Sequence, residues 1–102
     1  MLAEIYCKTE HFQEAREQYQ AALEIAPEDA RLRDGLGAVY AALGDWPRAA
    51  EQFRRALQLD PNLCSANYNM GMAMAKQGKV QEAQFYLDRA KKLQGARSEA
   101  AP

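Results

Sequence analysis

The sequence predicts an all-α fold of stacked antiparallel helix pairs, and three observations support this prediction. A pattern of small, large and turn residues recurs every 34 residues along the chain. Within each recurrence, apolar residues fall at helical spacing, which places them on one helix face. Glycine and proline stand between these segments, where they favour turns. Because one helix pair cannot bury its apolar face alone, successive copies are expected to stack into a continuous core.

The recurrence includes small residues, large apolar residues and turn residues in a single register. Pro27 and Pro61 align with Gly95, and Gly44 aligns with Gly78. Chance does not produce such agreement in three successive segments. Further aligned sets are Ala15, Ala49 and Ala83; Ala22, Ala56 and Ala90; Leu2, Leu36 and Met70; and Ala3, Gly37 and Gly71.

The middle segment shows why each unit should be two helices joined by a tight turn. Its first helix ends at Gly44, after which Asp45 is expected to cap the second helix and Pro47 to occupy its first turn. The sequence "LDPN" at 59–62 ends the second helix, because a proline disfavours helix at the preceding residue. The two apolar stripes consist of Leu32, Leu36, Val39, Tyr40 and Leu43, then Trp46, Ala49, Ala50, Phe53, Ala56 and Leu57.

Small residues at 37, 49 and 56 are expected where the two helices approach each other closely. A helix backbone can come near its neighbour only where the intervening side chain is short or absent. Larger side chains at 49 or 56 should therefore overpack the interface.

Residues 30–63 carry the pattern L-G-x-x-Y, A-x-x-x-F-x-x-A and P, and this pattern resembles the tetratricopeptide repeat (TPR). The aromatic residue that the family has near the start of a repeat is absent, since Arg33 and Asn67 stand there. The resemblance implies a right-handed superhelical solenoid of helix pairs. The matching residues are Leu36, Gly37, Tyr40, Ala49, Phe53, Ala56 and Pro61, followed by Met70, Gly71, Met74, Ala83, Leu87 and Ala90.

The resemblance divides the chain into about three units over residues 1–95. We expect a truncated first repeat at 1–29, a second at 30–63, a third at 64–95 and a disordered tail at 96–102. Both ends of such an array would present surfaces built for a neighbouring helix. Two explanations stay open: the chain is a segment of a longer array, or its ends pair with each other.

The charge distribution is compatible with pairing of the ends. Residues 1–34 carry four basic and eight acidic side chains, whereas residues 69–102 carry six basic and three acidic ones. Opposite charges at the two ends would favour head-to-tail association, which propagates unless it closes. The sequence thus allows a homo-oligomer formed through exposed repeat ends.

Composition argues against several function classes. A net charge of -1 provides no general attraction for nucleic acid. No run of about 18 apolar residues exists, so no membrane span is expected. The N-terminal "MLAEIYCKTEH" lacks the basic start and apolar core of a signal peptide, and we expect a cytoplasmic protein.

Residues for catalysis or cofactor binding are sparse. Cys7 and His11 could share a helix face, but Cys64 alone remains as a further metal ligand, so no metal or other cofactor is predicted. His11 occupies a predicted turn, and "GLGAVY" lacks the third glycine and preceding strand of a dinucleotide site. We therefore expect that the chain is not an enzyme.

The family resemblance implies a concave groove, lined by the first helix of each repeat, that holds a segment of a partner. Gly35 and Ser65 also occupy facing positions. The residues expected to bind the partner are Glu4, Lys8, Arg31, Asp34, Ala38, Tyr68, Asn69, Met72 and Lys76.

Asn69 and Met72 each admit two interpretations. Asn69 matches an asparagine that some TPR proteins use to hold a peptide backbone, and it could equally lie on a polar helix face. Met72 is either an adaptable apolar contact or a partly covered surface residue. The clamp by which chaperone-binding members hold a terminal carboxylate is not expected, because Asp34 stands where that clamp needs a lysine.

The predicted function is that of a protein-interaction scaffold or adaptor that binds a peptide segment of a partner in the groove. One alternative is a self-assembling module. Others are a fragment of a longer TPR protein, either a secretion-type chaperone or the array that recruits substrates to an enzyme such as a glycosyltransferase.

Overall fold

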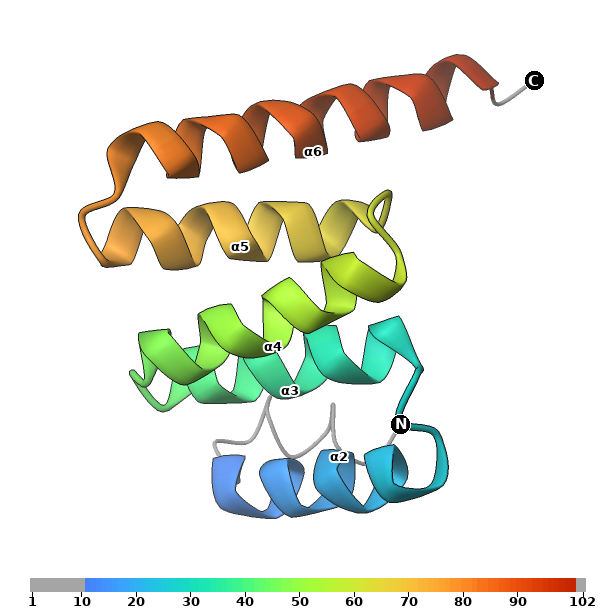
Figure 1. Ribbon diagram of the computed structural model, residues 1–102, viewed down its shortest axis with the longest axis vertical. Coiled ribbons are helices and arrows are strands. Elements are labelled where there is room, and N and C mark those ends of the chain that lie inside the picture. Colours follow the sequence, from blue (N-terminus) through green and yellow to red (C-terminus); the bar gives the residue numbers. More distant parts are fainter. Residues whose placement is uncertain (1–10, 101–102) are drawn as a thin grey trace.

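The computed structural model describes residues 11–100, and this part of the chain folds into α-helices without a strand (Figure 1). Successive helices run back and forth, with α2 at one end of the stack and α6 at the other (Figure 1). The all-α prediction is confirmed. The helices are α2 (Phe12–Ile25), α3 (Ala30–Ala42), α4 (Trp46–Leu59), α5 (Cys64–Lys76) and α6 (Val80–Ala100).

The turns within the helix pairs form as their residues predict. Gly44 and Gly78 have φ angles of 81° and 77°, in the left-handed region that a residue without a Cβ adopts without strain. Asp45 then caps α4, its Oδ1 accepting a hydrogen bond from the Arg48 N–H at 3.2 Å. Pro47 lies in the first turn of α4, where its missing N–H costs nothing.

Close approach of the paired helices explains the small residues. A Cβ added to Gly37 would lie 2.4 Å from Cε1 of Phe53, and one added to Gly71 would lie 2.7 Å from Cδ2 of Leu87. Ala49 and Ala56 are fully buried in the same region. The predicted packing role of residues 37, 49 and 56 is confirmed.

The core continues from one helix pair to the next. Phe53 on α4 belongs to a buried cluster that also contains Met70 and Met74 of α5 and Ala83 of α6. A second cluster joins Tyr19 of α2 to α3. Stacking of the pairs thus buries the apolar faces that a single pair would expose.

The C-terminal part of the chain differs from the prediction. A disordered tail was expected from residue 96, yet α6 continues through Gly95 to Ala100. Glycine inside a helix costs only about 1 kcal/mol relative to alanine. Because no proline follows before Pro102, the helix can continue past this position.

Residues 1–10 and 101–102, which include the truncated first helix predicted at the N-terminus, lie outside the described residues. None of the helices in the described part is both long enough and apolar enough to cross a membrane.

Candidate functional site

Three polar side chains meet where α3 packs beside α5, and we call them the Asp34 cluster. The Asp34 carboxylate on α3 accepts one hydrogen bond from Ser65 Oγ at 2.6 Å and one from Asn69 Nδ2 at 3.0 Å. Ser65 and Asn69 are four residues apart on α5, so both project from one face. The cluster links two successive helix pairs. Each of its three residues was expected in the groove, but their contact was not predicted.

Asp34 determines how the Asn69 amide is oriented. A carboxylate only accepts hydrogen bonds, so the NH₂ group of Asn69 must face it. The carbonyl oxygen of the same amide then points away from Asp34. Within the described residues this oxygen has no hydrogen-bond partner, and Asn69 therefore presents an oriented acceptor at a half-buried position.

Tyr68 lies beside a cavity of about 540 Å³ between the start of α5 and the later part of α6. Its side chain is 53% exposed, which is high for an aromatic residue. At the rim, the Cys64 thiol donates a hydrogen bond to the carbonyl oxygen of Ala90 at 3.3 Å. The cavity is lined by Cys64, Ser65, Tyr68, Leu87, Ala90, Lys91 and Gln94.

The equivalent surface one repeat earlier is covered. Phe53 and Ala56, which precede Leu87 and Ala90 by 34 residues, are 1% and 0% exposed beneath α5. No helix in the described residues covers the corresponding face of α5 and α6. Sequence reasoning did not identify Leu87 or Lys91 as residues of this surface, although the repeat register alone shows which positions need a covering neighbour.

The remaining predicted residues are distributed along the same two helices. Arg31 and Ala38 are exposed on α3, and Met72 is half-buried on α5. The Nζ of Lys76 lies 6.0 Å from the ring centroid of Trp46, a cation–π contact that the sequence did not suggest. Glu4 and Lys8 lie outside the described residues.

The structure corrects the prediction that Gly35 faces the groove. We expected it at a groove-facing position, but the ring of Tyr19 lies against it, with Cε1 only 2.4 Å from where a Cβ would stand. Gly35 therefore provides room for an aromatic side chain of the preceding helix. It is part of the packing between α2 and α3.

Groups suited to metal binding do not come together in the described part of the chain, where no three His, Cys, Asp or Glu side chains gather as ligands would. His11 stands at the start of α2 with its Nδ1 3.8 Å from Oε1 of Glu14.

Comparison with known proteins places the repeat pattern in a family. Two family models described as tetratricopeptide repeat match residues 1–62 and residues 40–101. No curated protein matches the chain by sequence.

Several solved structures share the fold. The TPR2B domain of yeast Sti1 in a complex with pHsp70 has a TM-score of 0.89 and 24% identity, covering 97% of this chain and 79% of that one. The Yersinia enterocolitica type III secretion chaperone SycD, solved with a peptide of the translocator YopD, has a TM-score of 0.84 and 23% identity, with coverages of 90% and 70%.

MamA is also similar, with a TM-score of 0.86 and 22% identity. The match covers 96% of this chain but only 57% of MamA, so the chain spans little more than half of that relative. At these identities the likeness shows the fold alone.

Proposed function

Because the chain belongs to the tetratricopeptide repeat family, we propose that it is a non-catalytic protein-interaction module that holds a peptide segment of a partner against α3 and α5. The observation that carries this proposal is the Asp34 cluster, which fixes the Asn69 amide with its carbonyl oxygen available. A fixed acceptor of this kind binds the main-chain N–H of a peptide without distinguishing its side chains. The proposed setting is the cytoplasm.

Neighbouring residues supply the other contacts of the proposed groove. Tyr68 offers a large exposed ring as an apolar anchor, and aromatic anchors commonly dominate binding energy. The small side chain of Ala38 lets a peptide backbone approach α3 closely. Arg31 supplies a charge at the margin, and Lys76 a second one beside Trp46. The solved relatives with bound peptides or partners provide an analogy for this mode of binding.

Peptides selected from a random display library against the whole chain test the proposal. Asn69→Ala and Tyr68→Ala should each weaken the selected peptides on the order of tenfold, which corresponds to about 1.4 kcal/mol. Gln81→Ala, at an exposed position near the start of α6, is the matched control and should bind as wild type. Circular dichroism should show unchanged helicity. Binding that survives both groove substitutions would contradict the assignment of the groove.

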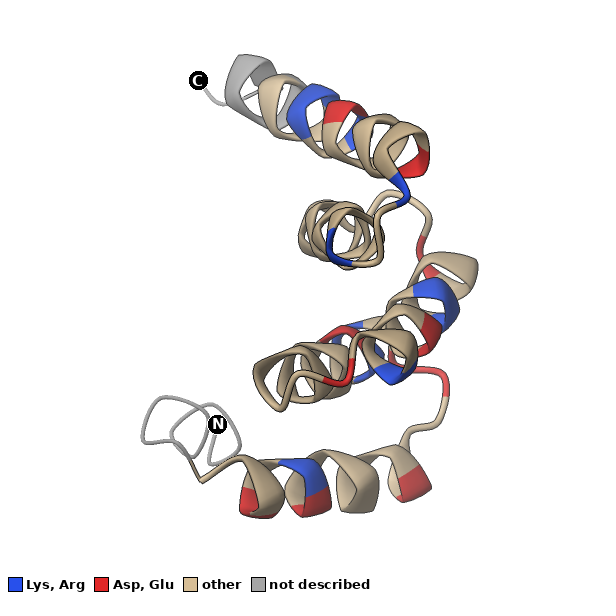
Figure 2. Ribbon diagram, turned by 90° about the vertical axis from the view of Figure 1, so that its left-hand side faces the viewer, with Lys and Arg blue, Asp and Glu red and all other residues tan. Residues whose placement is uncertain are grey.

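Self-association is a second candidate function, supported by the uncovered face that carries Leu87 and Tyr68. Figure 2 shows mostly acidic charged positions along α2 and a mixture of basic and acidic positions along α6, at opposite ends of the stack. The exposed face could pack on a second copy, or on a further repeat of a longer TPR protein. Such a longer protein could be a secretion-type chaperone or an enzyme with a recruiting array.

Size-exclusion chromatography with light scattering, at low and high salt, distinguishes this candidate from the groove. Oligomers that grow with protein concentration and shrink with salt support association through the charged ends. A monomer at every concentration would rule out self-association and leave the groove as the functional surface.

A further inference from the structure

A second hollow lies between α4 and α6, away from the Asp34 cluster, and we call it the Arg89 pocket. It encloses about 200 Å³ and contains no residue of α3 or α5. This volume is below the roughly 300–1,000 Å³ of sites for drug-sized ligands, and it suits one or two side chains. The pocket is lined by Arg54, Leu57, Gln58, Pro61, Phe85, Tyr86 and Arg89.

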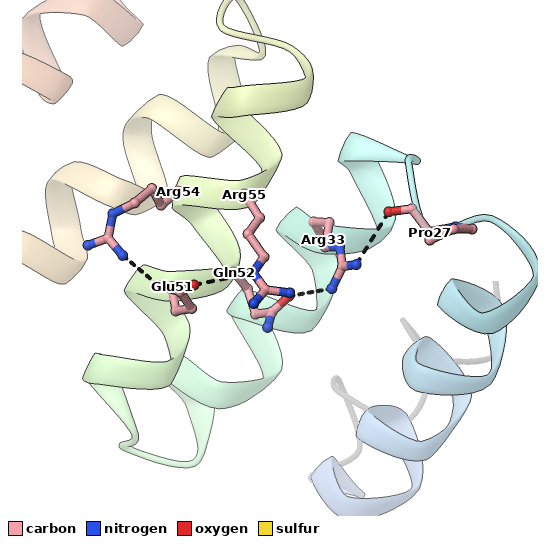
Figure 3. Close-up of polar contacts among 6 residues, drawn as sticks. All are labelled: Pro27, Arg33, Glu51, Gln52, Arg54 and Arg55. Atoms are coloured by element: carbon pink, nitrogen blue, oxygen red, sulfur yellow. Dashed lines mark hydrogen bonds and ion pairs between the residues drawn. The ribbon is translucent and has the colours of Figure 1, made fainter.

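One repeat earlier, a long side chain spans the corresponding place. Arg33 donates from Nη2 to the carbonyl oxygen of Pro27 at 3.4 Å and from Nη1 to Oε1 of Gln52 at 3.3 Å (Figure 3). The guanidinium therefore bridges the loop after α2 to the side of α4. Gln52 and Pro27 precede Tyr86 and Pro61 by 34 residues, so they mark the equivalent positions.

Asn67 replaces Arg33 at the later junction and is too short to make the same bridge. Its Nδ2 donates to the carbonyl oxygens of Pro61 at 3.1 Å and Leu63 at 3.0 Å. The proline carbonyl is thus satisfied as before, but within the described residues no hydrogen bond extends from Asn67 to Tyr86. The side-chain bridge that Arg33 makes at the first junction is therefore absent from the described residues of the second, where the Arg89 pocket lies.

The pocket lining carries positive charge. Two guanidinium groups, Arg54 and Arg89, border it and no carboxylate does. Arg54 pairs with Glu51 at 2.5 Å, as Figure 3 shows. Arg89 has no ion-pair partner in the described part of the chain. The lining therefore favours an anionic ligand, and Arg89 is the group available to meet it.

An exposed aromatic residue gives the pocket its apolar side. Phe85 is 58% exposed and packs edge-to-face on Tyr86, with ring centroids 5.1 Å apart. The residue 34 positions earlier is Glu51, which instead pairs with Arg54 and Arg55. An apolar ring thus stands where the preceding repeat carries a charged, solvated side chain.

We propose that the Arg89 pocket binds an acidic segment of a partner protein in which an Asp or Glu carboxylate stands beside an aliphatic or aromatic side chain. The carboxylate pairs with the Arg89 guanidinium, which can offer two parallel N–H donors. The neighbouring apolar side chain packs on Phe85 and Leu57. This surface is separate from the groove, so one chain can hold two segments at once.

Fluorescence anisotropy with a defined probe tests the proposal on the full chain. The probe is a fluorescein-labelled peptide, Gly-Glu-Leu-Glu-Phe-Glu-Gly, and its comparison peptide has glutamine in place of every glutamate. The wild-type chain should bind the acidic probe on the order of tenfold more tightly than the neutral one, and added salt should reduce the difference.

Two pocket variants locate the binding. Phe85→Glu, which copies Glu51 of the preceding repeat, and Arg89→Gln should each weaken the probe on the order of tenfold. Arg55→Gln removes the same charge at the position equivalent to Arg89, outside the pocket, and should bind as wild type. Circular dichroism checks that each variant folds.

Three results would overturn the proposal. One is the absence of binding at millimolar probe. Another is binding that Asn69→Ala removes while Phe85→Glu and Arg89→Gln leave it intact, because the probe would then occupy the groove. The third is a dimer of the free chain that Phe85→Glu dissociates, which would make a second copy the occupant.

Discussion

The junction between α2 and α3 and the junction between α4 and α5 occupy the same register of the repeat but are built from different side chains. At the first, the ring of Tyr19 covers Gly35 and Arg33 bridges Pro27 to Gln52. At the second, Asn69 replaces the glycine and Asn67 replaces the arginine.

The difference shows how one repeat fold accommodates different side chains at equivalent positions. Long side chains fill the first junction. At the second, Asn69 bonds to Asp34 and keeps its carbonyl oxygen available, while the hydrogen bonds given for Asn67 in the described residues stay within its own loop and helix start, beside the Arg89 pocket. The substitutions that distinguish the two junctions therefore lie at or beside the two binding surfaces that we propose for the later half of the molecule.

The largest effect is expected for Gly35→Leu, which places a side chain where the ring of Tyr19 lies. Overpacking of this kind costs about 3 kcal/mol, measured as a change in the free energy of urea unfolding. Asn69→Leu, at the equivalent position of the second junction, should cost less because a side chain of similar size already stands there. Adding Tyr19→Ala to Gly35→Leu should recover part of the loss, and no recovery would mean that the two side chains do not collide.

Asn67→Ala should be the next most destabilising, by about 2 kcal/mol. The substitution removes two part-buried hydrogen bonds and leaves the carbonyl oxygen of Pro61 without its side-chain partner. The unpaired Oδ1 of Asn67 is removed at the same time, which offsets part of the cost. Thermal and urea unfolding measure the change, and a fully stable variant would show that the carbonyls do not depend on Asn67.

Arg33→Asn makes the first junction resemble the second and should cost about 1 kcal/mol. Arg33 is half-buried whereas Asn67 is fully buried, and the bond from Arg33 to Pro27 is exposed, so water can replace part of what the shorter side chain loses. Urea unfolding measures this loss, and the result is compared with the loss measured for Asn67→Ala. A cost equal to or larger than that of Asn67→Ala would contradict the inference that the first bridge is the less buried of the two.

The smallest effect is expected for Lys76→Ala, about 0.5 kcal/mol, from loss of the cation–π contact with Trp46. The first junction has no such contact, since Ala42 and Phe12 stand at the equivalent positions. Lys79→Ala, in the neighbouring turn, is the control and should leave the unfolding free energy unchanged. Equal effects of the two substitutions would mean that the contact between Lys76 and Trp46 does not stabilise the fold.

Local chemistry made most of the fold predictable from sequence. Gly44, Asp45 and Pro47 form the expected turn and cap because each acts on backbone groups within a few residues. The prediction of a disordered tail from residue 96 differs from the structure, in which α6 continues to Ala100. One glycine is a weak helix breaker when no proline follows it closely.

The candidate site was less predictable because it depends on distances between repeats. Asp34 and Asn69 were both expected in the groove, but their hydrogen bond follows from how closely α3 and α5 pack. Gly35 was placed in the groove by register, and only the direction of the Tyr19 ring shows otherwise. The Arg89 pocket depends on how closely α4 and α6 pack, which the repeat pattern does not determine.

The most direct test of partner binding by α3 and α5 is a ¹H–¹⁵N NMR titration of the labelled chain with a display-selected peptide. The account predicts that the largest shifts occur at the backbone amides of Tyr68 and Asn69 and at the side-chain NH₂ of Asn69, which stays bonded to Asp34. Shifts confined to α2, α4 or α6 would contradict it.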